Sequence, residues 1–179
     1  MRAAQQRIVD TAGELFAEHG VAGTSLQMIA DAIGVTKAAV YHQFRTKDEI
    51  VLAVAQAELA NLEVAIAAAE AEPNASRARG VLVTRMVDLA VARRRMESML
   101  LSDPVIVRFF AAHEPYRRVM GRMYRVLAGS DPDARVAAAM LTAAIGGAVM
   151  HPIVAELDDE TLRAQLLLLA RRFLDLPDA

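Results

Sequence analysis

Residues 24–50 read TSLQMIADAIGVTKAAVYHQFRTKDEI, and this stretch decides the fold. Its first half carries apolar residues at helical spacing, with Ile29 and Ala30 on the inner side. Gly34 then supplies the positive φ with which a chain leaves a helix sharply. A second short helix follows and turns Val40 inward against the first. The pattern predicts two short helices joined by a tight turn, a helix-turn-helix.

Hydroxyl residues mark where these helices begin, because they cap the free N–H groups of a first turn. Thr24 with Gln27, and Thr46 with Glu49, have the spacing of a capping box. Thr36 can cap the helix that lies between them. We therefore expect three helices to begin directly after these three threonines.

Helical periodicity continues outward from this stretch in both directions, and no segment alternates long enough to predict a sheet. Gly20, Gly129 and the Pro73-Asn74 pair are among the breaks. We expect an all-α fold of about nine helices, over residues 3–19, 25–34, 36–43, 46–72, 76–99, 104–112, 114–128, 132–150 and 159–174. We expect the helix-turn-helix, at about residues 25–44, to belong to an N-terminal domain of residues 1–50, and the remaining helices to form a larger helical domain of residues 51–179.

Composition narrows the class of protein. The chain has 179 residues, is 55% hydrophobic and contains no cysteine, so a sizeable core can form and thiolate chemistry is excluded. The lack of cysteine fits a cytoplasmic location, and the polar start predicts no signal peptide. The net charge of -2 gives no bulk attraction to nucleic acid, so DNA contact would need a local basic patch.

One uncharged segment has to be considered as a possible membrane span. From Val136 to Ala155 there is no Asp, Glu, Lys or Arg, and the length would permit a span. However, the run is rich in alanine and glycine and includes His151 and Pro152. These residues favour a helix packed closely on a partner, so we expect no membrane.

The second short helix has the chemistry of a surface that enters a DNA groove. Its outward side combines one cation, small residues and two hydrogen-bonding rings, which are Thr36, Lys37, Ala38, Tyr41 and His42. The small Ala38 lets the backbone approach the bases. Lys37 and Lys47 are the only lysines, and no acidic residue occurs between Asp31 and Asp48. Together with Arg45 they predict a local positive face.

These residues carry a resemblance to a known family. The run from Val35 to Ile50 places Tyr41, Phe44 and Lys47 at three-residue steps, and residues 8–20 add a matching first helix. In these positions and their spacing, residues 7–54 resemble the DNA-binding domain of the TetR (tetracycline-repressor) family. The rest of the chain is similar only in being helical and of suitable length.

The resemblance implies roles for individual positions. Ser25 and Gln27 match phosphate contacts, Lys47 matches a phosphate anchor, and Phe44 matches a core position. Ala38 and Ala39 stand where glycine or a hydroxyl residue is frequent, and Arg45 replaces a frequent proline or small residue and can add a phosphate contact. The expected DNA-binding residues are therefore Ser25, Gln27, Thr36, Lys37, Ala38, Tyr41, His42, Arg45 and Lys47.

The C-terminal part is rich in methionine, which admits two interpretations. Such a set usually forms an ordinary helical core, and it can equally line an adaptable apolar cavity for an effector. The candidate cavity residues are Met86, Met99, Phe109, Phe110, Tyr116, Met120 and Tyr124.

The last two expected helices predict a dimer. An apolar stripe on the final helix is wider than one domain face needs, and the alanine-rich helix before it allows close approach. The alternative is that both helices serve only the core of one chain. The expected interface residues are Ala139, Ala143, Gly147, Leu162, Leu166, Leu169 and Phe173.

From these patterns we predict a homodimeric transcriptional repressor, released from a palindromic operator in double-stranded DNA by a small, mainly apolar effector. The alternative is a small-molecule-binding or protein-interaction module on the same fold that does not read an operator. We expect no cofactor and no metal site. The sequence has no phosphate-binding glycine loop, no nucleophile elbow and no spaced cluster of histidines and carboxylates, so it does not predict an enzyme.

Overall fold

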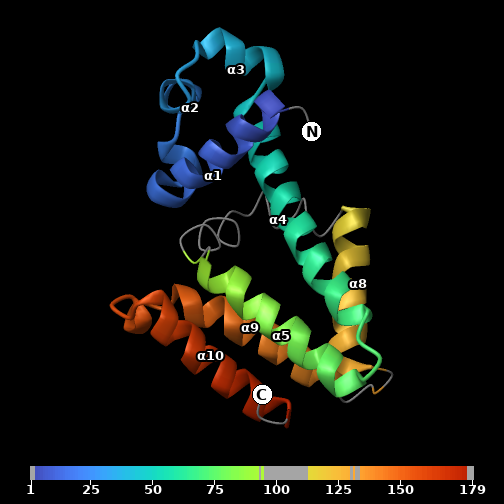
Figure 1. Ribbon diagram of the computed structural model, residues 1–179. Helices are drawn as coiled ribbons and strands as arrows, with labels where there is room; N and C mark the ends of the chain where they lie inside the picture. Colours follow the sequence, from blue (N-terminus) through green and yellow to red (C-terminus); the bar gives the residue numbers. More distant parts are fainter. Residues whose placement is uncertain (1–2, 93, 95–112, 130, 132–133, 177–179) are drawn as a thin grey trace. The chain divides into compact units, whose positions relative to one another are not determined.

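The computed structural model describes residues 3–92, 94, 113–129, 131 and 134–176, and these form helices and no strand (Figure 1). The predicted all-α class is confirmed. The expected helix at 104–112 and the end of the one at 76–99 lie outside the described residues. The chain divides into two compact units. In the described part, the N-terminal unit comprises residues 3–58 and the C-terminal unit comprises residues 59–92, 94, 113–129, 131 and 134–176, so the division falls inside one helix.

The N-terminal unit contains three helices and the first half of a fourth. They are α1 (Ala3–Gly23), α2 (Leu26–Ala32), α3 (Lys37–Gln43) and α4 (Lys47–Glu70). Gly20 interrupts α1 with φ 74° and ψ 164°, which confirms the break expected there. The unit is held together by fully buried apolar side chains from all four helices, including Phe16, Ile29, Val40 and Ile50.

Two of the three predicted caps are confirmed and one is wrong. Thr36 Oγ1 accepts a hydrogen bond from Ala39 N at 3.2 Å and caps α3. Thr46 caps α4, because its Oγ1 accepts from Glu49 N at 3.2 Å, and the Glu49 carboxylate accepts in return from Arg45 N at 2.7 Å, one residue before the position expected for a capping box. At the start of α2, however, the cap is Ser25, whose hydroxyl accepts from Met28 N at 3.2 Å. The hydroxyl of Thr24 is instead buried and bonded to α1.

The tight turn between α2 and α3 forms as the sequence predicts. Gly34 has a φ of 70°, where a side chain would be strained. Val35 N donates to Ala30 O at 2.9 Å, which closes the turn against the end of α2. Arg7 of α1 adds a hydrogen bond from Nη2 to Ile33 O at 3.1 Å. The angle between α2 and α3 is therefore set by the backbone and supported by α1.

The C-terminal unit is a helical bundle built on one apolar core. It contains the end of α4, then α5 (Ala75–Ala92), α8 (Glu114–Ala128), α9 (Ala134–Met150), a 3-10 turn η1 (Pro152–Val154) and α10 (Asp159–Phe173). α5 packs against α8, α9 and α10, and α9 packs against α8 and α10. Among the buried side chains at the centre are Ile66, Leu82, Val87, Val119, Met123, Leu141, Ile145, Leu162 and Leu166.

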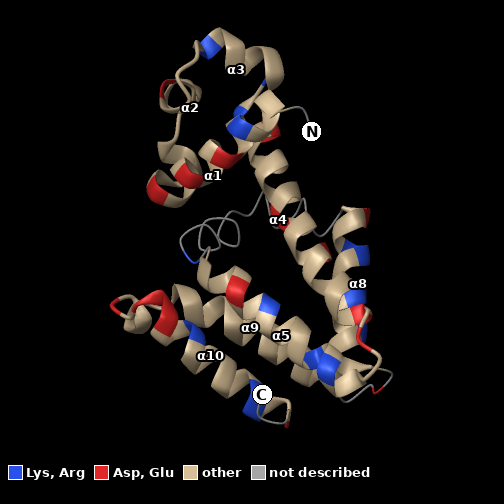
Figure 2. Cartoon of the chain, viewed as in Figure 1, with Lys and Arg blue, Asp and Glu red and all other residues tan. Residues whose placement is uncertain are grey.

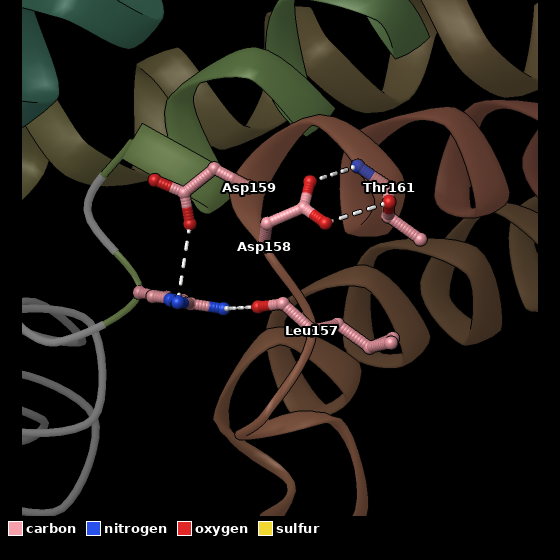
Figure 3. A network of polar contacts seen from close by, with 5 residues as sticks. Leu157, Asp158, Asp159 and Thr161 are labelled. Atoms are coloured by element: carbon pink, nitrogen blue, oxygen red, sulfur yellow. Dashed lines mark hydrogen bonds and ion pairs between the residues drawn. The ribbon is translucent and has the colours of Figure 1, made fainter.

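Polar contacts join the helices of this unit at its surface. Arg122 of α8 pairs with Glu70 of α4 at 2.6 Å, and Arg163 of α10 pairs with Asp88 of α5 at 2.6 Å. Where α10 begins, Asp158 accepts hydrogen bonds from the amide and hydroxyl of Thr161 (Figure 3). The guanidinium of Arg94 donates to Leu157 O and pairs with Asp159, which ties the chain beyond α5 to this end of α10.

Among the described helices, α4 alone has the length and mean hydropathy that a membrane span requires. A helix from the core of a protein without a membrane span passes the same test, and part of α4 is buried in the fold described here. The uncharged run that begins at Val136 is divided, because α9 ends at Met150 before Pro152 begins η1.

Candidate DNA-binding site

Helix α3 has one side that is buried in the N-terminal unit and one side that is exposed. Val40 is fully buried and Phe44, directly after the helix, is 8% exposed. Thr36, Lys37, Ala38, Tyr41 and His42, the residues predicted to face DNA, are all exposed. The structure therefore brings these five side chains together on one open face.

Two residues of this face support each other. The ammonium nitrogen of Lys37 lies 5.7 Å from the ring centroid of Tyr41, one helical turn further on. A cation at this distance from an aromatic face is attracted to it. The Tyr41 side chain is 45% exposed, so its ring and hydroxyl remain accessible to a ligand.

His42 presents a hydrogen-bond donor on the same face. The amide Nε2 of Gln43 lies 3.2 Å from Nδ1 of the His42 ring. When that amide donates to Nδ1, the proton of the neutral ring is on Nε2. The outer edge of the ring can then donate to a phosphate or a base.

The charge distribution around α3 fits an anionic partner. Lys37 and Arg45 are exposed, and none of the residues between Asp31 and Asp48 is acidic. Figure 2 shows the acidic residues of this unit on α1, α2 and α4, and none on α3. Two of the three cations predicted to form a local positive face, Lys37 and Arg45, are therefore exposed in a stretch without acidic residues, whereas Lys47 is only partly exposed.

Ser25 and Gln27, at the start of α2, are both exposed. Ser25 uses a lone pair of its hydroxyl to cap α2, which leaves its hydroxyl hydrogen free to donate. Gln27 donates from Nε2 to Asp31 Oδ1 at 2.7 Å, so part of its hydrogen-bonding capacity is used within α2.

Lys47 differs from the other expected DNA contacts. It is only partly exposed, and its ammonium group donates to Val21 O at 2.7 Å and to Thr24 O at 3.2 Å. Val21 lies in α1 beyond the interruption at Gly20, and Thr24 lies between α1 and α2. Sequence spacing could not reveal these partners, because they lie more than twenty residues away in the chain.

The residues expected to line an effector cavity are only partly described. Met86, Met120 and Tyr124 pack against the core of the C-terminal unit, and Tyr124 Oη lies 3.3 Å from Thr142 Oγ1. Burial raises the pKa of the Tyr116 phenol, and the neighbouring Tyr124 raises it further. The three remaining candidates, which are Met99, Phe109 and Phe110, lie outside the described residues.

A groove of about 730 Å³ runs along α5 beside the end of α10. Its lining combines apolar surface with charged residues of both signs, which are Glu72, Arg77, Arg85, Asp88 and Arg171. Among the described residues it contains none of the expected effector residues, and the sequence patterns did not single it out.

The expected dimer residues fall into two groups. Leu162 and Leu166 are buried within their own unit, so they belong to its core. The side chains of Leu169 and Phe173 are 61% and 48% exposed. On α9, Ala139, Ala143 and Gly147 are exposed at four-residue steps, and a Cβ at Gly147 would meet nothing within 4 Å. Further exposed apolar side chains beside these are Val136, Met140 and Leu168.

Comparison with known proteins agrees with this geometry. Residues 8–54 match the profile described as bacterial regulatory proteins, tetR family. The HTH-type transcriptional repressor AcnR of Corynebacterium diphtheriae is 30% identical over 63 residues, which are 35% of this chain and 33% of the relative. The HTH-type transcriptional regulator AcrR of Shigella flexneri is 46% identical over 46 residues, or 26% of this chain and 21% of the relative. The matches thus span a third or less of these relatives' own lengths.

Solved structures extend the likeness to the fold of almost the whole chain. A transcriptional regulator from Aquifex aeolicus has a TM-score of 0.75 and 17% identity, covering 95% of this chain and 99% of that one. The fatty acid degradation regulator FadR of Bacillus halodurans has a TM-score of 0.76 and 17% identity, covering 97% and 96%. At such identities the likeness concerns the fold alone.

The tight turn at Gly34, followed by a short helix with a buried side and an exposed side that carries Lys37, defines the N-terminal unit as a helix-turn-helix. Within that class, residues 8–54 match the profile of the tetR family of bacterial regulatory proteins, so the N-terminal unit is similar to the helix-turn-helix domain of that family.

Proposed function

We propose that this protein is a homodimeric transcriptional repressor that binds a palindromic operator in cytoplasmic double-stranded DNA through α3. The observation that carries the proposal is the division of α3 into a buried side, with Val40 and Phe44, and an open side. An element that only stabilised the fold would have no reason to display a cation and two hydrogen-bonding rings on that open side.

The open side of α3 suits the major groove, which is about 12 Å wide and admits a helix. Ala38 and Ala39 are small and exposed, so the helix backbone can lie close to the base edges. Lys37 can reach acceptor atoms of guanine, and Tyr41 and His42 can donate to bases or phosphates. Arg45 and Ser25 lie on neighbouring segments and complete the phosphate contacts.

A second copy of the chain is needed to read a palindrome. The exposed apolar residues of α9 and α10 support a four-helix interface made from two helices of each subunit. A glycine inside a helix costs about 1 kcal/mol relative to alanine. No contact with the described part of the chain accounts for Gly147, whereas close approach of a partner helix would. Two α3 helices would then enter successive major grooves, roughly 34–36 Å apart.

Release from the operator completes the proposal. A small, mainly apolar effector binds in the C-terminal unit among residues such as Met86, Met120 and Tyr124. It favours a state in which α4 swings and spoils the spacing of the two α3 helices. The effector must bind that state better, by about 1.4 kcal/mol for each tenfold loss of operator affinity. No enzymatic step and no cofactor enter this mechanism.

Selection of genomic DNA fragments by the purified protein, followed by titration of the recovered site, tests the proposal. We expect a palindromic site that the folded protein binds at least about a thousandfold more tightly than scrambled DNA of the same length. The double variant Lys37→Ala, Tyr41→Ala should lose that preference while it keeps its helical content. Equal affinity for selected and scrambled DNA would contradict the proposal and favour the module that does not read an operator.

A further inference from the structure

The end of α1 is closed by a buried polar cluster. Gly20 interrupts the helix, and the carbonyls that precede it need new donors. The Thr24 hydroxyl lies 2.9 Å from Gly20 O and 3.1 Å from Leu15 O, and the Thr24 residue is 1% exposed. Among the described residues of the N-terminal unit, Thr24 is the one polar residue that is buried. The segment from Gly20 to Thr24 is therefore held by hydrogen bonds, which makes it an ordered element of the fold.

Lys47 closes the same cluster from the other side. It is the first residue of α4, and its Nζ donates to Val21 O and Thr24 O. An ammonium group has three N–H donors, and two of them are used here. A hydrogen bond from a charged donor to a carbonyl is stronger than one between neutral groups. The start of α4 is thus bonded to the segment that leads into α2.

A short chain of contacts runs from this bond to the DNA-facing helix. Thr24 is followed directly by Ser25, the cap of α2. The end of α2 is joined to the start of the next segment by the Val35 N to Ala30 O bond, and Thr36 then caps α3. A shift of the start of α4 would therefore act on α2 through the Lys47 bonds, and on α3 through the turn that joins α2 to α3.

We propose that Lys47 is a positioning residue, through which α4 holds α2 and α3 in the orientation that reads the operator, and that its charge serves this bond and no phosphate contact. The inference deepens the proposed function and rests on it. It makes a DNA-binding property depend on a side chain that need not touch DNA.

The roles open to Lys47 differ in what its loss would do. Loss of a phosphate contact weakens specific and non-specific binding alike, and lowers the slope of log affinity against log salt by about 0.9. Loss of a merely structural contact lowers the melting temperature and leaves DNA binding intact below it. Loss of a positioning residue weakens binding to the operator, leaves non-specific binding and the salt slope unchanged, and also lowers the melting temperature.

The test compares Lys47→Met with Lys37→Met, the same substitution at the exposed lysine of α3. Both variants and the wild type are titrated with selected and scrambled DNA across a range of salt, well below their melting temperatures. For Lys47→Met we expect operator affinity to fall about tenfold or more, equivalent to 1.4 kcal/mol, with the wild-type slope. For Lys37→Met we expect the slope to fall. A slope reduced by about 0.9 in Lys47→Met, or operator affinity equal to the wild type, would overturn the proposal.

Thr24→Val provides a second variant that alters the same cluster without changing charge. It should also lose operator affinity at an unchanged salt slope, which a phosphate contact cannot explain. Hydrogen exchange of the free protein gives a readout that needs no DNA: amides of residues 21–26 should exchange faster in Lys47→Met and not in Lys37→Met. Unchanged exchange there would refute the bond's role even if operator affinity falls. A wild type without preference for selected DNA would instead contradict the proposed function.

Discussion

The ammonium group of Lys37 lies over the ring of Tyr41 on the open face of α3, 5.7 Å from the ring centroid. The pair places a positive charge and a hydroxyl group side by side where a phosphate or a base edge would arrive. Each residue also limits the rotamers of the other, so less conformational freedom is lost when DNA binds.

Tyr41 should therefore matter more than its single hydroxyl suggests. Tyr41→Ala removes the ring that orients Lys37, and we expect operator affinity to fall by about tenfold to a hundredfold. Tyr41→Phe keeps the ring and should lose less. Fluorescence anisotropy with the selected operator measures both. Affinities of Tyr41→Ala within twofold of the wild type would remove Tyr41 from the interface.

The cap of α3 should be measurable as stability. Thr36→Ala removes the acceptor for Ala39 N and should cost about 1 kcal/mol in the free energy of unfolding. Thr36→Ser keeps that acceptor and serves as the matched control. Urea denaturation followed by circular dichroism distinguishes the two. Equal destabilisation by both variants would show that the Thr36 methyl group matters, and that the cap does not.

Exposed apolar residues on α10 should hold the dimer together. Leu169→Glu places a charge at a side chain that is 61% exposed in the single chain, so the subunit should still fold. We expect the variant to sediment as a monomer at micromolar concentration and to bind the operator far more weakly. Val64→Glu makes the same change at another exposed apolar position, on α4, and should remain dimeric. A dimeric Leu169→Glu would place the interface elsewhere.

The ion pair between Glu70 and Arg122 should give stability that depends on pH. The hydrogen bond from Arg122 lowers the pKa of Glu70 below 4.5. A carboxyl group whose pKa is lower in the folded state stabilises the fold above its unfolded pKa, and that contribution is lost as the pH falls through the folded value. Because both side chains are partly exposed, Glu70→Gln should cost at most about 1 kcal/mol at pH 7.

The same comparison at acidic pH completes this test. Urea denaturation at pH 3 should show a smaller difference between Glu70→Gln and the wild type than denaturation at pH 7. A difference that is independent of pH would mean that the carboxylate charge contributes nothing, and that the substitution acts through packing alone.

The helix-turn-helix could be predicted closely because its signals are local. Gly34, Val40 and the Thr36 cap each act within a few residues, so periodicity and spacing place them correctly. Thr24 shows the limit of such signals. It has the right type and spacing for a cap, yet its hydroxyl is bonded to α1, and Ser25 caps α2 one residue later. A contact between helices decided between two equally suitable neighbours.

The same limit applies to charges and to apolar stripes. Spacing identified Lys47 as a cation near α3, but its partners at Val21 and Thr24 become neighbours only when the chain folds. On α10, periodicity predicted one broad apolar stripe. Periodicity could not show that Leu166 lies in the core of its own unit while Leu169 is exposed. The two residues are less than one helical turn apart, so they fall in the same apolar stripe of the sequence.

The division of the chain within α4 constrains any hybrid regulator made from it. From Lys47 to Glu70 the helix contains neither glycine nor proline, and the division at Glu58 falls inside it. Adding one residue there would turn the side-chain positions of the rest of α4 by about 100° around the helix axis, whereas adding seven would nearly restore the phase. A foreign sensor domain joined to the N-terminal unit within α4 must therefore keep the helical phase of α4.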